Sequence, residues 1–185
     1  DASPIQFNGT YSSSPRLAVL GNKWLLVRQD NWSHDECGAS TVSTFIDATG
    51  AKSLEQSVHG PYSSCGGNGA SSIGLASNNS VALMVQSQEI TSGVETDVLA
   101  RLINADGSVQ PMINLTPWEG DQYNPRATWD GSRFVVVWQD QRLGLGGEWG
   151  LEQLDARSDL VGMRVTATGA IVDPQAFVFS NSLFG

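Results

Sequence analysis

A strand–turn–strand pattern that recurs about every 55 residues constrains the fold of this chain more than any other feature. Its clearest copy is NPRATWDGSRFVVVWQDQR at Asn124–Arg142, and a second copy is SPRLAVLGNKWLLVRQDN at Ser14–Asn31. The prolines of these copies stand at positions 15 and 125, and the midpoint falls on Ala70, where GASSIGLASNNSVALMVQSQ has the same shape. A second signature follows each copy (STFIDATGA, ARLINADGS, GMRVTATGA) and places three glycines in equivalent turns: Gly50, Gly107 and Gly169.

Each unit is predicted to contain four short antiparallel strands, because apolar runs alternate with turns that contain Gly or Asn. The predicted strands are Arg16–Val19, Lys23–Arg28, Val42–Asp47 and Leu54–Val58; then Ile73–Ala76, Val81–Gln86, Asp97–Asn104 and Gln110–Leu115; then Arg126–Trp129, Arg133–Gln139, Leu160–Thr166 and Ala176–Phe179. The second strand of each unit is apolar on successive residues (WLLV, VALMV, FVVVW), which indicates a strand covered on both faces. No stretch keeps a helical period, so helix content should be low.

Four-stranded antiparallel units at this spacing are typical of β-propeller blades, and a β-sandwich is the alternative. We expect an all-β chain that forms one β-propeller segment over residues 1–185, with blades at about 14–68, 69–123 and 124–180. Residues 1–10 are predicted to form an outer strand, because DASPIQF resembles DPQAFVF at Asp173–Phe179.

Three blades are too few to close a ring, since closed propellers usually have four to eight. Further blades, from a second copy or from another chain, are therefore expected as partners. The apolar flanks that such blades would cover are predicted to carry Phe134, Val136 and Trp138 at one end and Trp24 and Leu26 at the other. The strand tryptophans Trp24, Trp129 and Trp138 are expected in the core.

The third unit resembles a bacterial secreted or surface β-propeller repeat that occurs in tandem. The resemblance is carried by Pro125, Ala127, Asp130, Gly131, Phe134, Trp138, Asp140, Arg142, Asp159, Gly162, Arg164 and Gly169. The first unit departs from this pattern with Arg28 in place of the tryptophan, and the second unit is the most divergent. The resemblance implies a fold and says little about chemistry, since propellers host many functions.

The composition excludes several classes of function. Ten Lys and Arg against nineteen Asp and Glu give a net charge of −9, so the chain repels nucleic-acid phosphates and anionic membrane surfaces. No apolar run approaches the length of a membrane span. Lysine is nearly absent while Asn, Ser, Gly and Thr abound, a texture typical of loop-rich β proteins that are secreted, periplasmic or at the cell surface.

The long connections are predicted to gather at one end of the strands, which we call the long-loop end. They comprise residues 31–41, 59–70, 87–96, 116–123 and 141–158. The other end, the turn end, carries only tight turns. Ligand sites commonly lie on loops held by a rigid scaffold, so binding is expected at the long-loop end.

Aromatic and acidic residues in these connections are the candidate ligand-binding residues. Trp32, Trp118 and Trp149 are either stacking platforms for a sugar or peptide, or lids packed on their own blades. The acidic candidates are Glu148, Glu152 and Asp155. Their carboxylates suit acid/base chemistry on a glycoside, Ca²⁺ coordination, or simply a solvated acidic rim.

Cys37 and Cys65 lie in polar, Gly/Ser-rich stretches, which favours a disulfide between two loops over free thiols or a metal site. His34 and His59 have no metal-binding spacing, and no nucleophile elbow, phosphate-binding loop or dinucleotide fingerprint occurs. We therefore expect no catalytic residue, no resident metal and no cofactor. The sequence favours a non-catalytic exported binding or scaffold module for a carbohydrate or protein ligand. An accessory subunit of a larger assembly and a glycoside-active propeller enzyme are the alternatives.

Overall fold

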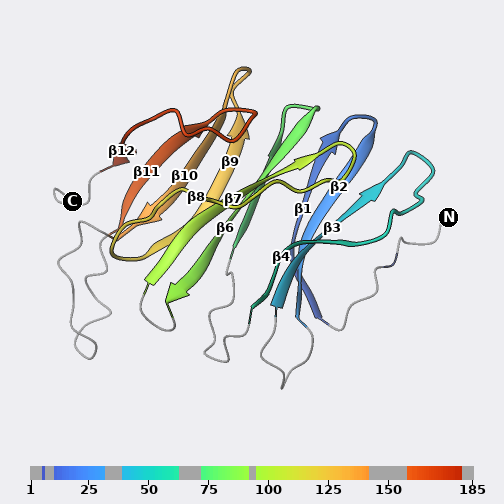
Figure 1. Cartoon of the computed structure of the whole chain (residues 1–185), viewed down its shortest axis with the longest axis horizontal. Coiled ribbons are helices and arrows are strands. Elements are labelled where there is room, and N and C mark those ends of the chain that lie inside the picture. The colour runs from blue at the N-terminus through green and yellow to red at the C-terminus, as the bar shows by residue number, and fades with distance from the viewer. Residues whose placement is uncertain are drawn as a thin grey trace.

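The computed structural model describes residue 6 and residues 11–31, 39–62, 72–91, 95–141 and 158–180. These residues form twelve strands in three four-stranded antiparallel sheets, which confirms the all-β prediction. The sheets lie side by side in a row, and the described residues show no closed propeller (Figure 1). Within the described part of the chain, no helix is long and apolar enough to cross a membrane.

Each sheet is a meander of four consecutive strands. Sheet 1 contains β1 (Tyr11–Leu20), β2 (Lys23–Asn31), β3 (Ala39–Ile46) and β4 (Gln56–Tyr62). Sheet 2 contains β5 (Ile73–Ser77), β6 (Val81–Thr91), β7 (Glu95–Asn104) and β8 (Ile113–Asn114). Sheet 3 contains β9 (Gln122–Trp129), β10 (Phe134–Asp140), β11 (Asp159–Val165) and β12 (Phe177–Ser180). Every predicted strand overlaps the observed strand at its place in the unit.

The three sheets repeat one register. Beside the first turn, each sheet has an equivalent pair: Val19 with Trp24, Ser77 with Ala82, and Trp129 with Phe134; in sheet 1 the pairing runs one step further, to Leu20 with Lys23. The second hairpin closes on an isolated bridge: Ile46 with Lys52, Ile103 with Val109, and Val165 with Ile171. The register therefore places Trp24, Ala82 and Phe134 at one equivalent position of the repeat.

The glycine signatures form the second hairpin turns, as predicted. Gly50, Gly107 and Gly169 have φ values of 85°, 93° and 89°, a region that side chains with a Cβ rarely adopt. In the first of these turns, Asp47 Oδ1 accepts hydrogen bonds from Thr49 N at 2.8 Å and Ala51 N at 3.0 Å. The same oxygen accepts from Thr49 Oγ1 at 2.6 Å, and this side-chain bond first, then the two backbone bonds, lowers the pKa of Asp47. The aspartate and the glycine together fix the turn.

Apolar side chains of neighbouring sheets pack face to face in two clusters. The cluster between sheets 1 and 2 contains Leu20, Leu25, Val27, Phe45, Val58, Ile73, Ala82, Met84 and Ile103. The cluster between sheets 2 and 3 contains Ala76, Val81, Leu83, Val85, Val98, Ala100, Leu102, Leu115, Phe134, Val136, Trp138, Val161, Met163 and Val165. Alternate residues of β6 enter different clusters, so sheet 2 is covered on both faces, as its sequence predicts.

Two predictions about the core are wrong. Trp24 is 50% exposed, because it lies on the outer face of sheet 1, where no described sheet packs. Phe134, Val136 and Trp138 do not line an open flank, because their face of sheet 3 packs on sheet 2 and all three are fully buried. The predicted core placement of Trp138 is confirmed.

Candidate functional site

Most of the predicted ligand-binding residues lie outside the described residues. These are Trp32, Trp149, Glu148, Glu152 and Asp155, together with Cys37, Cys65 and His34. The predicted disulfide and the third-unit acidic rim therefore stay predictions, as does the outer strand at residues 1–10, of which only Gln6 is described. Trp118 is the candidate that the structure places, at the long-loop end between sheets 2 and 3.

Trp118 follows β8 and packs on the core between sheets 2 and 3. Its ring centroid lies 6.5 Å from that of Trp138, with the two rings inclined at 31°. Its backbone N–H donates to Thr116 O at 2.7 Å, which tightens the chain over the core. The ring is half-buried, so Trp118 covers its own unit while one part of it still faces solvent. This geometry supports the lid interpretation and leaves a partial platform for a ligand.

Asp121 links sheets 2 and 3 beside Trp118. Its Oδ1 accepts from Thr96 N at 2.9 Å, and its carbonyl oxygen accepts from Gln141 N at 2.9 Å. Tyr123 forms a side-chain hydrogen bond with Asp121 as well. Burial, and then the neighbouring carboxylate, raise the pKa of Tyr123 to about 12. Tyr123 is thus a neutral hydroxyl at every physiological pH, able to donate or accept.

Asp97 lies on β7 in sheet 2, is buried, and is bound by the side-chain amide of Asn114. Asn114 Nδ2 donates to Asp97 Oδ2 at 2.6 Å, while Asn114 Oδ1 accepts from Thr116 N at 3.0 Å. Burial raises the pKa of Asp97. Val98 N donates to Thr116 Oγ1 at 2.7 Å, so these hydrogen bonds tie residues 114–116 to β7 at the end of sheet 2.

A buried polar row crosses sheet 3 at the same end. Gln122, Asp140 and Asp159 are neighbours in register on β9, β10 and β11, and all three are buried. Trp138 Nε1 donates to Asp140 Oδ2 at 3.0 Å, and Gln122 Nε2 donates to Gly120 O at 2.9 Å. Sequence reasoning did not select Gln122 or Asp140 as site residues. The recurrence of Gln-Asp at the end of the second strand, in RQD of β2 and WQD of β10, is the sequence signal that points to Asp140.

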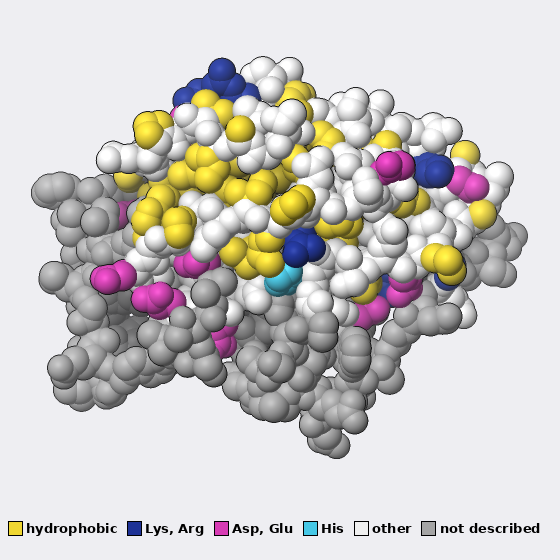
Figure 2. All heavy atoms as spheres, in the orientation of Figure 1, with side chains coloured by type: hydrophobic (Ala, Val, Ile, Leu, Met, Phe, Trp, Pro, Cys, Tyr) yellow, Lys and Arg dark blue, Asp and Glu magenta, His cyan; other side chains and the backbone are white. Residues whose placement is uncertain are grey.

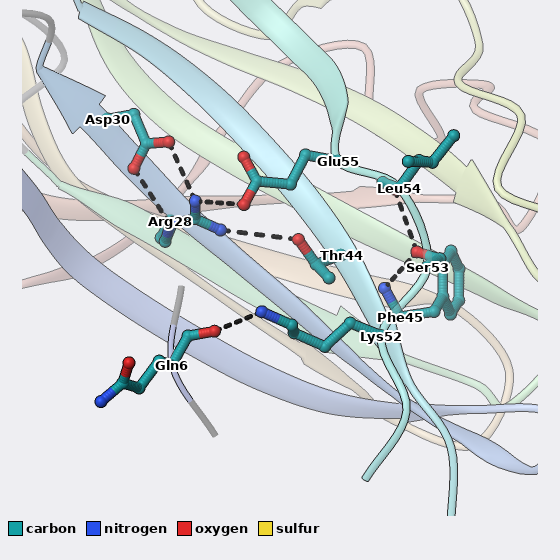
Figure 3. A network of polar contacts seen from close by, with 9 residues as sticks. All are labelled: Gln6, Arg28, Asp30, Thr44, Phe45, Lys52, Ser53, Leu54 and Glu55. Carbon is teal, nitrogen blue, oxygen red and sulfur yellow. Dashed lines mark hydrogen bonds and ion pairs between the residues drawn. The ribbon is translucent and has the colours of Figure 1, made fainter. Parts of the chain in front are cut away.

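Sheet 1 uses the equivalent positions for an ion-pair network. Arg28, which replaces the tryptophan, donates from Nε and Nη2 to the two oxygens of Asp30, each at 2.9 Å (Figure 3). Its Nη2 also lies 2.7 Å from Glu55 Oε1, and its Nη1 lies 3.5 Å from Thr44 Oγ1. A buried guanidinium needs such partners because desolvation would otherwise be very costly. Asp30 and Asp140 therefore have the same structural role. Each accepts a hydrogen bond from the side chain two residues before it, which is Arg28 in sheet 1 and Trp138 in sheet 3.

A polar seam joins sheets 1 and 2 at the long-loop end. Thr41 Oγ1 donates to Gln86 Oε1 at 2.8 Å, and a His59 ring nitrogen lies 2.5 Å from Gln88 Oε1. Burial lowers the pKa of His59, so the ring is neutral near pH 7. Arg101 Nη1 donates to Val58 O at 2.7 Å across the same seam. Figure 2 shows acidic side chains spread around the rim of the face in view, several along its lower border, and apolar side chains across its middle.

The described residues contain no group of three or more His, Cys, Asp or Glu that could hold a metal ion. No protein-family model matches the chain, and no curated protein matches it significantly. What this end offers chemically is a half-buried indole, a neutral phenol and hydrogen-bonded carboxylates. That set can stack on and hydrogen-bond to a ligand.

Proposed function

We propose that the chain is a non-catalytic, exported binding or scaffold module that takes a carbohydrate or protein ligand at the long-loop end. The observation that carries this proposal is the group formed by Trp118, Asp121 and Tyr123 at the seam between sheets 2 and 3. An aromatic face beside fixed hydrogen-bonding groups suits the apolar face and hydroxyls of a sugar, or a peptide. The three residues lie in one segment, residues 118–123, that leads into β9 and is tied to sheet 2 by the hydrogen bond from Thr96 N to Asp121 Oδ1.

The hydrogen bonding of the carboxylates supports a binding role over hydrolysis. A glycosidase needs two carboxyl groups that face one substrate, about 5 to 9.5 Å apart. Asp97 is held by Asn114, Asp121 by Thr96 and Tyr123, and Asp140 by Trp138. Each of these carboxylates stabilises its own part of the fold.

The test is binding to arrays of immobilised polysaccharides and peptides, followed by titration of the strongest hit. Tyr123→Phe removes one hydroxyl at the long-loop end, and Thr168→Val removes one at the turn end as the matched control. We expect Tyr123→Phe, Asp121→Asn and Trp118→Phe each to weaken binding by about tenfold, or about 1.4 kcal/mol. Thr168→Val should bind normally. Unchanged binding in all three folded variants would overturn the proposed site, and hydrolysis of a bound polysaccharide would overturn the non-catalytic role.

A second candidate function is that of a subunit that associates with further blades. It is favoured by large apolar side chains that remain exposed on the outer faces of sheets 1 and 3, among them Val19, Trp24, Leu160 and Phe179. Its test is the mass of the chain in solution.

A further inference from the structure

Sheets 1 and 3 stand at the two ends of the row, and each has an outer face on which no described sheet packs (Figure 1). The outer face of sheet 1 carries Leu17, Val19 and Trp24, and we call it the leading face. The outer face of sheet 3 carries Val135, Val137, Leu160, Phe177 and Phe179, and we call it the trailing face. These two faces are different surfaces, and the internal seams of the molecule show what each is built to contact.

The leading face is, by register, the same face of the repeat that sheet 3 packs against sheet 2. Trp24 is equivalent to Phe134, and Val19 is equivalent to Trp129. In sheet 3 this pair forms an edge-to-face contact with ring centroids 4.8 Å apart, and Phe134 is fully buried. In sheet 1 the same pair is 47% and 50% exposed. The part of the leading face around Val19 and Trp24 is therefore a sheet-packing surface without its neighbour, whereas Leu26 and Arg28 further along the same face are 6% and 2% exposed.

The trailing face is, by register, the face that sheet 2 presents to sheet 3. Val135 and Val137 are equivalent to Leu83 and Val85, which are fully buried in the seam between sheets 2 and 3. On sheet 3 both valines are half-buried. The chain thus carries counterparts of the two halves of its own internal seam, one at each end, with Arg126 on the trailing face at the position of Gly74.

Local packing on the trailing face extends its apolar surface. A Cβ on Gly162 would lie 2.9 Å from a ring carbon of Phe179 and 3.0 Å from one of Phe177, so both rings lean over this glycine. The two rings are in edge-to-face contact with centroids 5.0 Å apart. Phe179 remains 55% exposed, which leaves one aromatic face for a neighbour.

Charge disfavours the meeting of two trailing faces. The trailing face carries Arg126 and Arg164, with Asp173 as the partner of Arg164, which leaves one cation in excess. On the leading side, the cations Arg28 and Lys52 are balanced by the carboxylates Asp30 and Glu55. A trailing face therefore meets less repulsion on a leading face than on a second trailing face.

From these observations we propose that a second copy of this chain docks its trailing face on the leading face, and receives the first copy's trailing face on its own leading face. Two copies then form a ring of six sheets about a two-fold axis, in which both new seams repeat the internal seam. Six sheets fall in the range of closed propellers, and closure prevents the open filament that a head-to-tail contact otherwise generates. This proposal is independent of the ligand site at the long-loop end.

The first test is sedimentation equilibrium of the full chain and two variants at micromolar concentration. The wild type should sediment at twice the chain mass of 19.7 kDa. Trp24→Lys places a charged side chain in the apolar part of the leading face and should give a folded species of single-chain mass. Ile171→Lys is the matched control, because Ile171 is 42% exposed but pairs with the inward-facing Val165 and so belongs to neither outer face, and it should remain a dimer.

The second test mixes two variants that each lose one face. Phe179→Asp removes the trailing face by placing a carboxylate opposite Glu55, and it should be a monomer alone, as Trp24→Lys is. An equimolar mixture restores one intact seam, so a dimer that contains one copy of each variant should appear. A dimer formed by Phe179→Asp alone would show that leading faces pair with each other, which overturns the proposal. A folded wild-type monomer, a dimeric Trp24→Lys or an open polymer of rising mass would overturn it as well.

Discussion

Sheets 2 and 3 are built from the same repeat, yet their second strands bury different sets of side chains. In β6 every residue from 81 to 87 is buried, whereas β10 alternates between buried residues and residues that are half-buried or exposed. The two strands read VALMVQS and FVVVWQD, so both are apolar on successive positions. The difference comes from the neighbours, because sheet 2 has a packed sheet on each side and sheet 3 has one. Position in the row does not decide burial alone, because β2 of sheet 1, at the other end of the row, also buries residues 25 to 29 in succession.

The largest expected effect is the difference in stability loss between substitutions at two equivalent aromatic positions. Phe134→Ala should lower the free energy of unfolding by about 3 to 5 kcal/mol, because it opens a cavity in the core between sheets 2 and 3. Trp24→Ala, at the equivalent position on the open face, should cost less than about 1 kcal/mol at protein concentrations low enough to exclude association. Urea unfolding followed by circular dichroism measures both values. Equal losses would show that the outer face of sheet 1 is covered in the monomer.

A smaller effect compares the same residue type on the two sheets. Val85→Ala removes two buried methyl groups and should cost about 2 kcal/mol, including the cavity that remains. Val137→Ala, its equivalent on the trailing face, should cost about half as much or less, since that side chain is only half-buried. The same unfolding experiment applies. The two losses should approach each other once a second copy covers the trailing face, which sharpens the comparison.

Sequence predicted the elements of the fold well because their causes are local. Gly50, Gly107 and Gly169 are required by positive φ, and their spacing located the hairpins and hence the strands. Which face of each strand points into the core could not be predicted in the same way. FVVVW is apolar on both faces, so no periodicity tells which of Phe134 and Val135 points inward. That choice depends on which side of sheet 3 meets sheet 2, a long-range fact.

The candidate site was less predictable for the same reason. Trp118 was selected because it is an aromatic residue in a long connection, and it does lie at the predicted end. Asp121 and Tyr123 belong to the segment that starts the next sheet, and they meet Thr96 only because sheets 2 and 3 pack together. Asp140 has a local signal, since it follows the buried Trp138 by two residues in a repeated pattern. A contact between residues of two packed sheets leaves no such local pattern in the sequence.

The smallest expected effect concerns the seam between sheets 1 and 2, which is the more polar of the two. Burial lowers the pKa of His59 below its ordinary value of 6.5, and nearby Arg101 acts in the same direction. The unfolded chain therefore binds a proton at a higher pH than the folded chain does. Stability is then complete above the unfolded pKa and falls as the pH decreases through that value toward 5. Sheets 2 and 3 contain no histidine, so the seam between them has no imidazole that responds in this way. Unfolding free energies at pH 5 and pH 7.5 should thus differ in the wild type and differ less in His59→Gln, which keeps an amide beside Gln88. An unchanged pH dependence in that variant would assign the effect to another titrating group and leave the two seams alike in their response to acid.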